Sequence, residues 1–421
     1  MGFAARGATA RTVGVGALVA ALGVGVLSAA AADEASGVAG SPVDVGQAAC
    51  GNGWTGGSAG PLTFALSNSA ALVQEVQIQD VASRRIFVDV EDLGVGAARS
   101  VTLALPAGTY RFLCMGGADG RAFAGPSWTL TGDYRGATTP GVLPASELDF
   151  IKPVDAYSAW TAGQLSRLRG DVSALTTALR RGHLLAARHA WMRAQRQYLL
   201  LGAAYDAFGD LGDAIDSPVT PGVAPLTDPH LTGLPKLEAV LWHAKPVPAG
   251  PRSRAAKRAR ARVTAYLRQS AVPVARRLLA DVTKVAATFD NPVQPSNTDM
   301  GLRSHEILED ALRFELTGRD DAGAHLTLFD VDAMVDATRD VIAPLRDLLA
   351  ERDPDLAVTD AWLDRLARYV DTFHRAGTDT WTPYGRLSIA QQRRLESILS
   401  QTVEYLSEIA VVLDPVQAGP A

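Results

Sequence analysis

The sequence predicts a multidomain protein in which a small β-sandwich is followed by an all-α helical bundle. At 421 residues the chain is too long for a single compact core. Before residue 132 the apolar residues form short alternating runs, whereas after residue 146 they recur every three or four residues. We therefore expect a β domain at 41–132, a linker at 133–146 and a helical domain at 147–415.

The first 32 residues are typical of an export signal. Arg6 and Arg11 precede an apolar run at 13–27, and the small residues at 28–32 suit cleavage by a signal peptidase. The run is short for a membrane span, and no second run approaches that length. We expect the signal peptide to be removed and the mature chain, without a transmembrane segment, to act in the periplasm or the extracellular cell envelope.

The charge balance argues against nucleic acid as a partner. The net charge is −5 and the isoelectric point is near 5.8, whereas phosphate binding needs a basic face. One basic run stands out at 252–262, RSRAAKRARAR. Such a run is more often a solvated helix face than a patch for a partner.

Seven short runs predict the strands of the β domain. They alternate or are β-branched, and residues typical of turns separate them. The runs are 43–45, 62–66, 73–78, 86–90, 101–105, 110–113 and 128–130. About seven strands in about ninety residues favour a small Greek-key sandwich, and the run Tyr-Arg-Phe-Leu-Cys-Met near its end looks cupredoxin-like.

The β domain contains both cysteines of the chain and no histidine. A blue-copper site needs two histidines beside the cysteine, so none is expected. An even pair of cysteines in an exported protein favours a disulfide between Cys50 and Cys114. If the thiols are reduced, a metal site formed by Cys50, Glu75, Glu91 and Cys114 is the alternative.

Seven segments after the linker have helical periodicity. They are 149–181, 184–208, 255–287, 299–316, 331–349, 361–376 and 389–413. Ser388 and Gln391 fit a capping box at the start of the last one. The stretch 228–244 reads as a loop that turns into a further amphipathic helix, with Pro235 in its first turn.

Acidic and histidine side chains recur on these helices. The candidates are Glu238, His305, Glu306, Glu309, Asp310, His325, Asp330, Asp332, Asp336 and Asp340. Carboxylates that project inward from facing helices are how bundles hold iron, although each alone is usually a solvated group. Glu238 has two interpretations: it complements the helix dipole, or it is one ligand of a buried site.

The order of these segments resembles the EfeO/EfeM family of bacterial envelope iron-uptake proteins, in which a cupredoxin-like domain precedes an imelysin-like helical domain. In the β domain the similar stretches are Cys50, 73–78 with Glu75, 91–96 (EDLGVG) and 105–114 (LPAGTYRFLC). In the helical domain they are 205–216 (YDAFGDLGDAID), 228–242, 307–318 (ILEDALRFELTG) and 325–336 (HLTLFDVDAMVD). The resemblance covers nearly the whole mature chain.

The chain departs from the family's His-x-x-Glu motif. Glu238 is present, but Pro235 stands at the position of the histidine. Gly202 and Thr327 stand near positions where the family has a glutamate and an aspartate, and Asp336 replaces a glutamate. Pro235, Gly202 and Thr327 cannot supply the carboxylate or imidazole that the family has there.

The resemblance implies an exported protein that binds or presents ferrous or ferric iron without catalysis. The expected ligands are Glu238, His325, Asp336 and Glu309 in the bundle, with Glu75 and Glu91 in the β domain. The implied partners are an iron permease and a peroxidase-like protein of the same envelope system. Two alternatives stay open: a degenerate scaffold that binds no metal, and, least favoured, an imelysin-like metallopeptidase.

Overall fold

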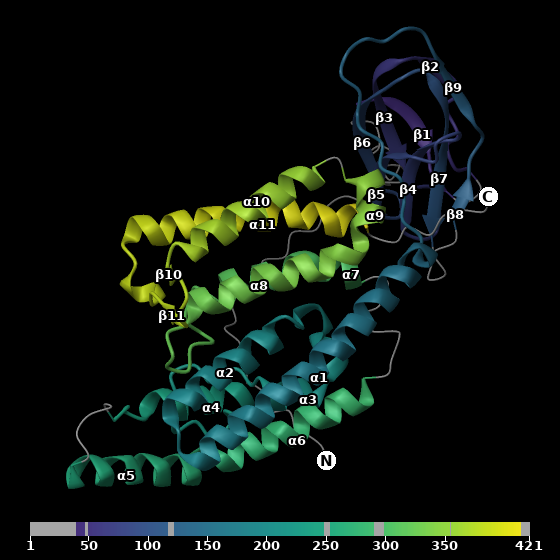
Figure 1. Cartoon of the computed structure of the whole chain (residues 1–421). Helices are drawn as coiled ribbons and strands as arrows, with labels where there is room; N and C mark the ends of the chain where they lie inside the picture. Colours follow the sequence, from purple (N-terminus) through teal and green to yellow (C-terminus); the bar gives the residue numbers. More distant parts are fainter. Residues whose placement is uncertain are drawn as a thin grey trace, which may run out of the picture.

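The computed structural model describes residues 39–46, 49–116, 122–247, 253–289, 299–353 and 355–413. The predicted signal peptide lies outside these residues. A β-rich part precedes an all-α part, as the sequence predicts (Figure 1). Within the described ranges, no helix has the length and apolar character that a membrane span requires.

The β domain is a sandwich of two sheets. Its strands are β1 (Ser41–Asp44), β2 (Gly56–Ser58), β3 (Gly60–Ser67), β4 (Gln74–Asp80), β5 (Ile86–Leu93), β6 (Ala98–Leu105), β7 (Gly108–Gly116), β8 (Ala122–Ala124) and β9 (Trp128–Thr131). One sheet has the order β1-β3-β6 and the other β2-β9-β7-β4-β5, with β8 beside β7. All seven predicted strands are present, and β2 and β8 were not predicted because three residues are too few to show alternation.

Aromatic side chains fill the space between the two sheets. The Phe64 and Phe112 rings lie 5.6 Å apart, and Tyr110 stacks on Trp128 at 5.1 Å. Such pairs stabilise a core beyond the area that they bury. The same core contains Cys50, which forms a disulfide with Cys114.

The helical domain follows the short 3₁₀ helix η2 (Glu147–Phe150). Its α-helices are α1 (Ile151–Arg181), α2 (Leu184–Leu199), α3 (Asp210–Ile215), α4 (Gly233–His243), α5 (Arg254–Ser270), α6 (Val272–Thr288), α7 (Asp299–Asp310), α8 (Thr327–Ile342), α9 (Arg346–Arg352), α10 (Leu356–Asp371) and α11 (Ile389–Val412). Between them lie the 3₁₀ helices η3 (Gly202–Phe208), η5 (Ala343–Leu345) and η6 (Tyr384–Arg386), the π-helix η4 (Ala311–Glu315) and the hairpin of β10 (His374–Arg375) and β11 (Thr380–Trp381).

Several predicted helices are interrupted, each for a local reason. The predicted helix 255–287 is two helices, because Pro273 has no N–H for a continuing hydrogen-bond ladder and occupies the first turn of α6. The predicted helix 184–208 ends at Leu199 and continues as η3. The capping box at Ser388 is confirmed, because its hydroxyl accepts a hydrogen bond from the Gln391 N–H.

Two groups of helices build the domain. The long α1 packs against α2 and α6, and α11 packs against α7 and α10. The groups meet where α8 contacts both α2 and α7.

The linker runs back along the sheet before the helices begin. Val142 and Ile86 exchange two backbone hydrogen bonds of 2.7 and 2.8 Å. The Arg352 guanidinium, from α9, donates to the Pro144 carbonyl at 3.2 Å and lies 3.5 Å from the Asp149 carboxylate. These contacts tie the linker to both domains.

Candidate functional site

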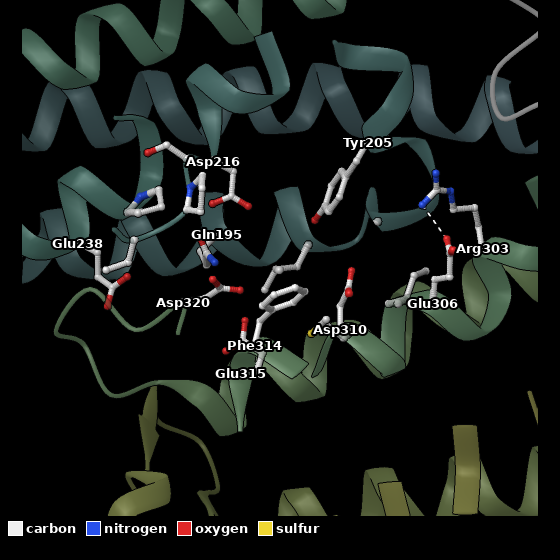
Figure 2. Close-up of a pocket in the computed structure, with 18 residues that line it drawn as sticks. Gln195, Tyr205, Asp216, Glu238, Arg303, Glu306, Asp310, Phe314, Glu315 and Asp320 are labelled. Atoms are coloured by element: carbon white, nitrogen blue, oxygen red, sulfur yellow. Dashed lines mark hydrogen bonds and ion pairs between the residues drawn. The ribbon is translucent and has the colours of Figure 1, made fainter. Parts of the chain in front are cut away.

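An acidic cavity lies where the two groups of helices meet. Its volume is about 360 Å³, and α2, η3, α4, α7, η4 and α8 all contribute to its walls. Six carboxylates line it, as Figure 2 shows: Asp216, Glu238, Glu306, Asp310, Glu315 and Asp320. Among the described lining residues Arg303 is the one basic side chain, and it binds Glu306 at 2.7 Å. The cavity therefore carries excess negative charge.

The start of α4 brings Glu238 to this cavity. Gly233 has a φ of +56°, and a Cβ at this position would lie 1.8 Å from the Ile215 carbonyl oxygen. Only glycine, which has no Cβ, allows this close approach, and glycine also adopts this backbone conformation without strain. The start of α4 is therefore held against the residue that precedes Asp216, and Glu238 follows five residues later.

A π-helical turn brings Glu315 to the same cavity as Asp310. In an α-helix, side chains five residues apart point about 140° away from each other. The Leu316 N–H donates to the Ala311 carbonyl in the wider i→i+5 pattern, at 3.0 Å. This wider turn rotates Glu315 toward the face of Asp310, and such turns often occur at functional sites.

Burial makes these carboxyl groups hard to ionise. Burial raises the pKa of Asp216 to about 7, with a further contribution from the charge of Asp320. Burial also raises the pKa of Glu238 and Glu315 well above the usual range, and neighbouring carboxylates raise both further. The Ala324 N–H donates to Glu238 at 2.7 Å, which partly opposes this shift.

Asp330 and Asp321 interact with Glu238 but are not part of the cavity lining. Asp330 is 8% exposed, and its Oδ1 has no hydrogen-bond partner among the described atoms. Its pKa is raised by burial and by the charges of Glu238 and Asp216. An unpaired oxygen atom in a buried acidic cluster is costly unless a cation or a proton is supplied.

The ligand set expected from the sequence does not come together around Glu238. Glu238 itself is 5% exposed and lines the cavity. Asp336 instead pairs with Arg196 and Arg339, and Glu309 lies 3.5 Å from Arg313.

His325 also lies outside the cavity, although a contact with Asp321 connects it to Glu238. Its side chain is 68% exposed and contacts Asp321, which in turn interacts with Glu238. Helix geometry explains why Asp336 does not face the cavity. Asp336 follows Asp330 by six residues on α8, so its side chain points about 120° away from that of Asp330.

Two positions that depart from the family's pattern belong to this cavity. Pro235 and Gly202 both line it, at the places where the resemblance implies a histidine and a glutamate. Thr327 is buried at the start of α8 and is not in the lining. Without those two side chains, this chain lines the cavity with carboxylate oxygens, and no histidine is among its described lining residues.

Four acidic residues near the cavity were not among the sequence candidates: Asp216, Glu315, Asp320 and Asp321. Asp216 and Glu315 lie inside the stretches 205–216 and 307–318 that carry the family resemblance. That resemblance is the one signal that could have identified them. In the described part of the chain, no three His, Cys, Asp or Glu side chains are already drawn together as a metal-binding group.

A second, smaller group of carboxylates lies on the outer face of the β-sandwich. The Gln77 amide donates to Glu75 at 2.8 Å and to Asp89 at 2.9 Å. Burial, together with the charges of Asp89 and Glu91, raises the pKa of Glu75 to about 7. Glu75 and Glu91 are therefore neighbours, and their role as ligands stays a prediction.

The alternative site that combined cysteines with glutamates does not form. Cys114 pairs with Val76 and points into the core, whereas Glu75 pairs with Met115 on the opposite face of the sheet. Strand alternation separates the two faces. The sulfur atoms are also bonded to each other.

The fold and the cavity define a two-domain protein whose helical part encloses a buried acidic cavity and whose β part is closed by a disulfide. The imelysin (peptidase M75) family model matches residues 153–380, more than half of the chain. The protein therefore belongs to the imelysin family. Relatives named "Iron uptake system component EfeO", from Escherichia coli K12, Shigella flexneri and Escherichia coli O157:H7, are each 22% identical over 360 residues. These matches cover 85% of this chain and 86% of each relative, in agreement with the predicted EfeO-like resemblance.

Proposed function

We propose that the protein is an exported, iron-binding component of an iron-uptake system, and that the acidic cavity of the helical domain holds iron as its cargo. The observation that carries this proposal is the set of six carboxylates around one cavity, with Arg303 as the one arginine among the described lining residues. The similarity to EfeO over both domains supports it, because those relatives are named as components of iron uptake.

The donor chemistry suits a hard cation. Carboxylate oxygens and water suit hard ions, whereas thiolates and imidazoles suit softer ones. The cavity is much larger than a bare ion, and a water molecule takes about 30 Å³ in the liquid. The iron would therefore keep part of its water shell, with the buried Glu238 and Glu315 and the half-buried Asp216 as its carboxylate neighbours.

Binding through oxygen atoms and water also fits a role in transport. A cargo ion has to be released, and an ion that keeps water in its shell leaves positions at which the ligands of a partner can enter. We propose that the protein presents iron to an envelope permease and to a peroxidase-like partner, and that it performs no chemistry on the iron itself.

A scaffold that binds no metal is the second candidate. Pro235 and Gly202 favour it, because they remove two donors from the cavity wall. The carboxyl groups would then simply stay protonated, as their raised pKa values allow. Hydrolysis is a weaker alternative, because it needs a metal-bound water beside a general base. Failure to cleave casein with iron or zinc present would exclude that activity on protein substrates.

The experiment that tests the proposal is a thermal unfolding series of the metal-stripped protein. The additions are ferric citrate, ferrous iron without oxygen, and calcium or magnesium as competing hard ions. A ligand that binds only the folded state raises the melting temperature in a concentration-dependent way. A rise with iron that exceeds the rise with calcium and magnesium supports the proposal. No rise with either form of iron would leave the scaffold as the better description.

A further inference from the structure

The helix α5 carries a basic surface that the proposed iron site does not use. Six of its 17 residues are basic: Arg254, Lys257, Arg258, Arg260, Arg262 and Arg268. No acidic residue occurs anywhere from position 245 to position 280, although the whole chain has a net charge of −5. Positive charge is therefore concentrated on one element of an acidic protein.

Five of the six basic side chains share the outer face of α5, whereas Arg260 follows the spacing of the opposite side. Ala256, Ala259, Val263 and Leu267 recur at three- and four-residue spacing and form the less exposed side, with Leu267 fully buried. That side packs against α1, α4 and α6. The other five cations, Arg254, Lys257, Arg258, Arg262 and Arg268, are exposed on the remaining surface.

The neighbouring end of α1 extends this surface. The Arg268 guanidinium donates to the Arg180 carbonyl at 3.0 Å, so the last turn of α1, with Arg180 and Arg181, lies beside α5. In Figure 1, α5 occupies the end of the helical domain that is farthest from the β-sandwich. The basic surface is therefore remote from both carboxylate clusters.

We propose that the outer face of α5 docks on an anionic lipid surface. Between the cations this face carries small residues, Ala255, Ala261 and Ala265, so the charges can approach a flat surface closely. It carries no aromatic or large aliphatic side chain of the kind that anchors protein–protein interfaces. A row of lysines and arginines with this composition is the pattern that anionic phospholipids attract.

The docking is peripheral and reversible by salt. The apolar side of α5 packs against α1, α4 and α6, so it is not free to insert into the bilayer. A 17-residue helix is about 25 Å long, which spreads the contact over several lipid headgroups. The inference is independent of the proposed iron cargo.

The test is cosedimentation of the chain lacking residues 1–32 with lipid vesicles. One set of vesicles contains phosphatidylcholine alone, and the other contains equal parts of phosphatidylcholine and phosphatidylglycerol. Binding is expected only to the anionic vesicles and is expected to disappear at about 0.5 M salt, where screening is strong. The variant R254E/K257E/R258E is expected to bind them at least about tenfold more weakly.

A matched control separates a local surface from overall charge. The variant R375E/R386E/R393E makes the same change in net charge at exposed positions on other elements, and it should bind like the unmodified protein. Equal loss in both variants would overturn the proposal, as would failure of the unmodified protein to bind anionic vesicles. Preference for soluble polyglutamate over the vesicles would assign the surface to an acidic protein and overturn the lipid proposal. Circular dichroism confirms that both variants are folded.

Discussion

Two groups of carboxylates in the described part of the chain differ in how the fold brings them together. In the β-sandwich, Glu75 and Asp89 come from adjacent strands, share one face of a sheet and are joined by the Gln77 amide. In the helical domain, the cavity gathers acidic side chains from five different segments between Asp216 and Asp320. The first group follows from strand pairing, and the second depends on how distant helices pack.

The two groups also differ in their exposure to water. Asp89 is exposed and Glu75 is half-buried, whereas Glu238 and Glu315 are 5% and 7% exposed. Water screens repulsion between exposed charges, but buried carboxylates need a proton or a cation. The comparison therefore singles out the helical cavity as the place where a cation would change the protein most.

The largest effect on stability should come from the disulfide, which is confined to the β domain. Replacing both Cys50 and Cys114 by alanine opens a loop with a sequence separation of 64. Chain-entropy arguments for a loop of this size give a loss of about 4 kcal/mol. Calorimetry should show a lower unfolding transition for the sandwich and little change in that of the helical domain. A similar decrease in both transitions would mean that the domains unfold together.

The next effect concerns the pH dependence of the cavity. The folded protein holds a proton on Asp216 up to about pH 7, while the unfolded chain releases it near pH 4. Unfolding therefore releases protons in this interval, and the stability of the metal-free protein falls as the pH rises from about 4 to 7. Asp216→Asn should remove part of this slope and stabilise the protein by about 2 kcal/mol at pH 7.5. Urea unfolding of both proteins at pH 5 and pH 7.5 measures this change in stability with pH. If the variant shows the same change as the unmodified protein, Asp216 is not the group that causes it.

Replacing Glu75 in the sandwich should also raise the stability at pH 7.5, but by less than replacing Asp216. Glu75 also has a pKa raised to about 7, but its side chain is half-exposed. Glu75→Gln should therefore change the stability at pH 7.5 by less than about 1 kcal/mol. A larger gain than that of Asp216→Asn would reverse the proposed difference between the two groups.

The smallest effect is expected at Asp336, which the sequence had suggested as a ligand. Its side chain is 44% exposed and pairs with Arg196 and Arg339. Asp336→Ala should cost less than about 1 kcal/mol of stability, as is usual for exposed ion pairs. Iron affinity should not change. A clear loss of affinity in an iron titration would mean that Asp336 is an iron ligand.

These cases show how far the sequence could predict the fold. The change from alternating to helical periodicity predicted both domains, because each pattern depends only on residues that are close in sequence. The break at Ala271 and the shift to η3 were missed, since the apolar periodicity continues across both points. The cupredoxin relationship of the sandwich and the export signal stay predictions.

The site was harder to predict than the fold. Glu238 was identified from its place in an apolar helix, but its neighbours Asp216 and Glu315 are 22 and 77 residues away in sequence. Their approach depends on the Gly233 contact and on the π-turn at η4, neither of which has a clear pattern in the sequence. Asp336 and His325 were chosen by similarity. Asp336 points elsewhere because each residue on a helix changes direction by about 100°, whereas His325 precedes α8, has a φ of +57° and contacts Asp321.

The most direct test of the central claim is a calorimetric titration of the metal-stripped protein with iron, in three forms. These are the unmodified chain, the cavity variant E238Q/E315Q and the sheet variant E75Q/E91Q, which removes the same number of carboxylates from the β domain. We predict that the cavity variant loses at least about 100-fold in iron affinity, while the sheet variant binds as the unmodified chain does. Loss of binding in the sheet variant with full binding in the cavity variant would contradict the account, and would place the iron on the β-sandwich.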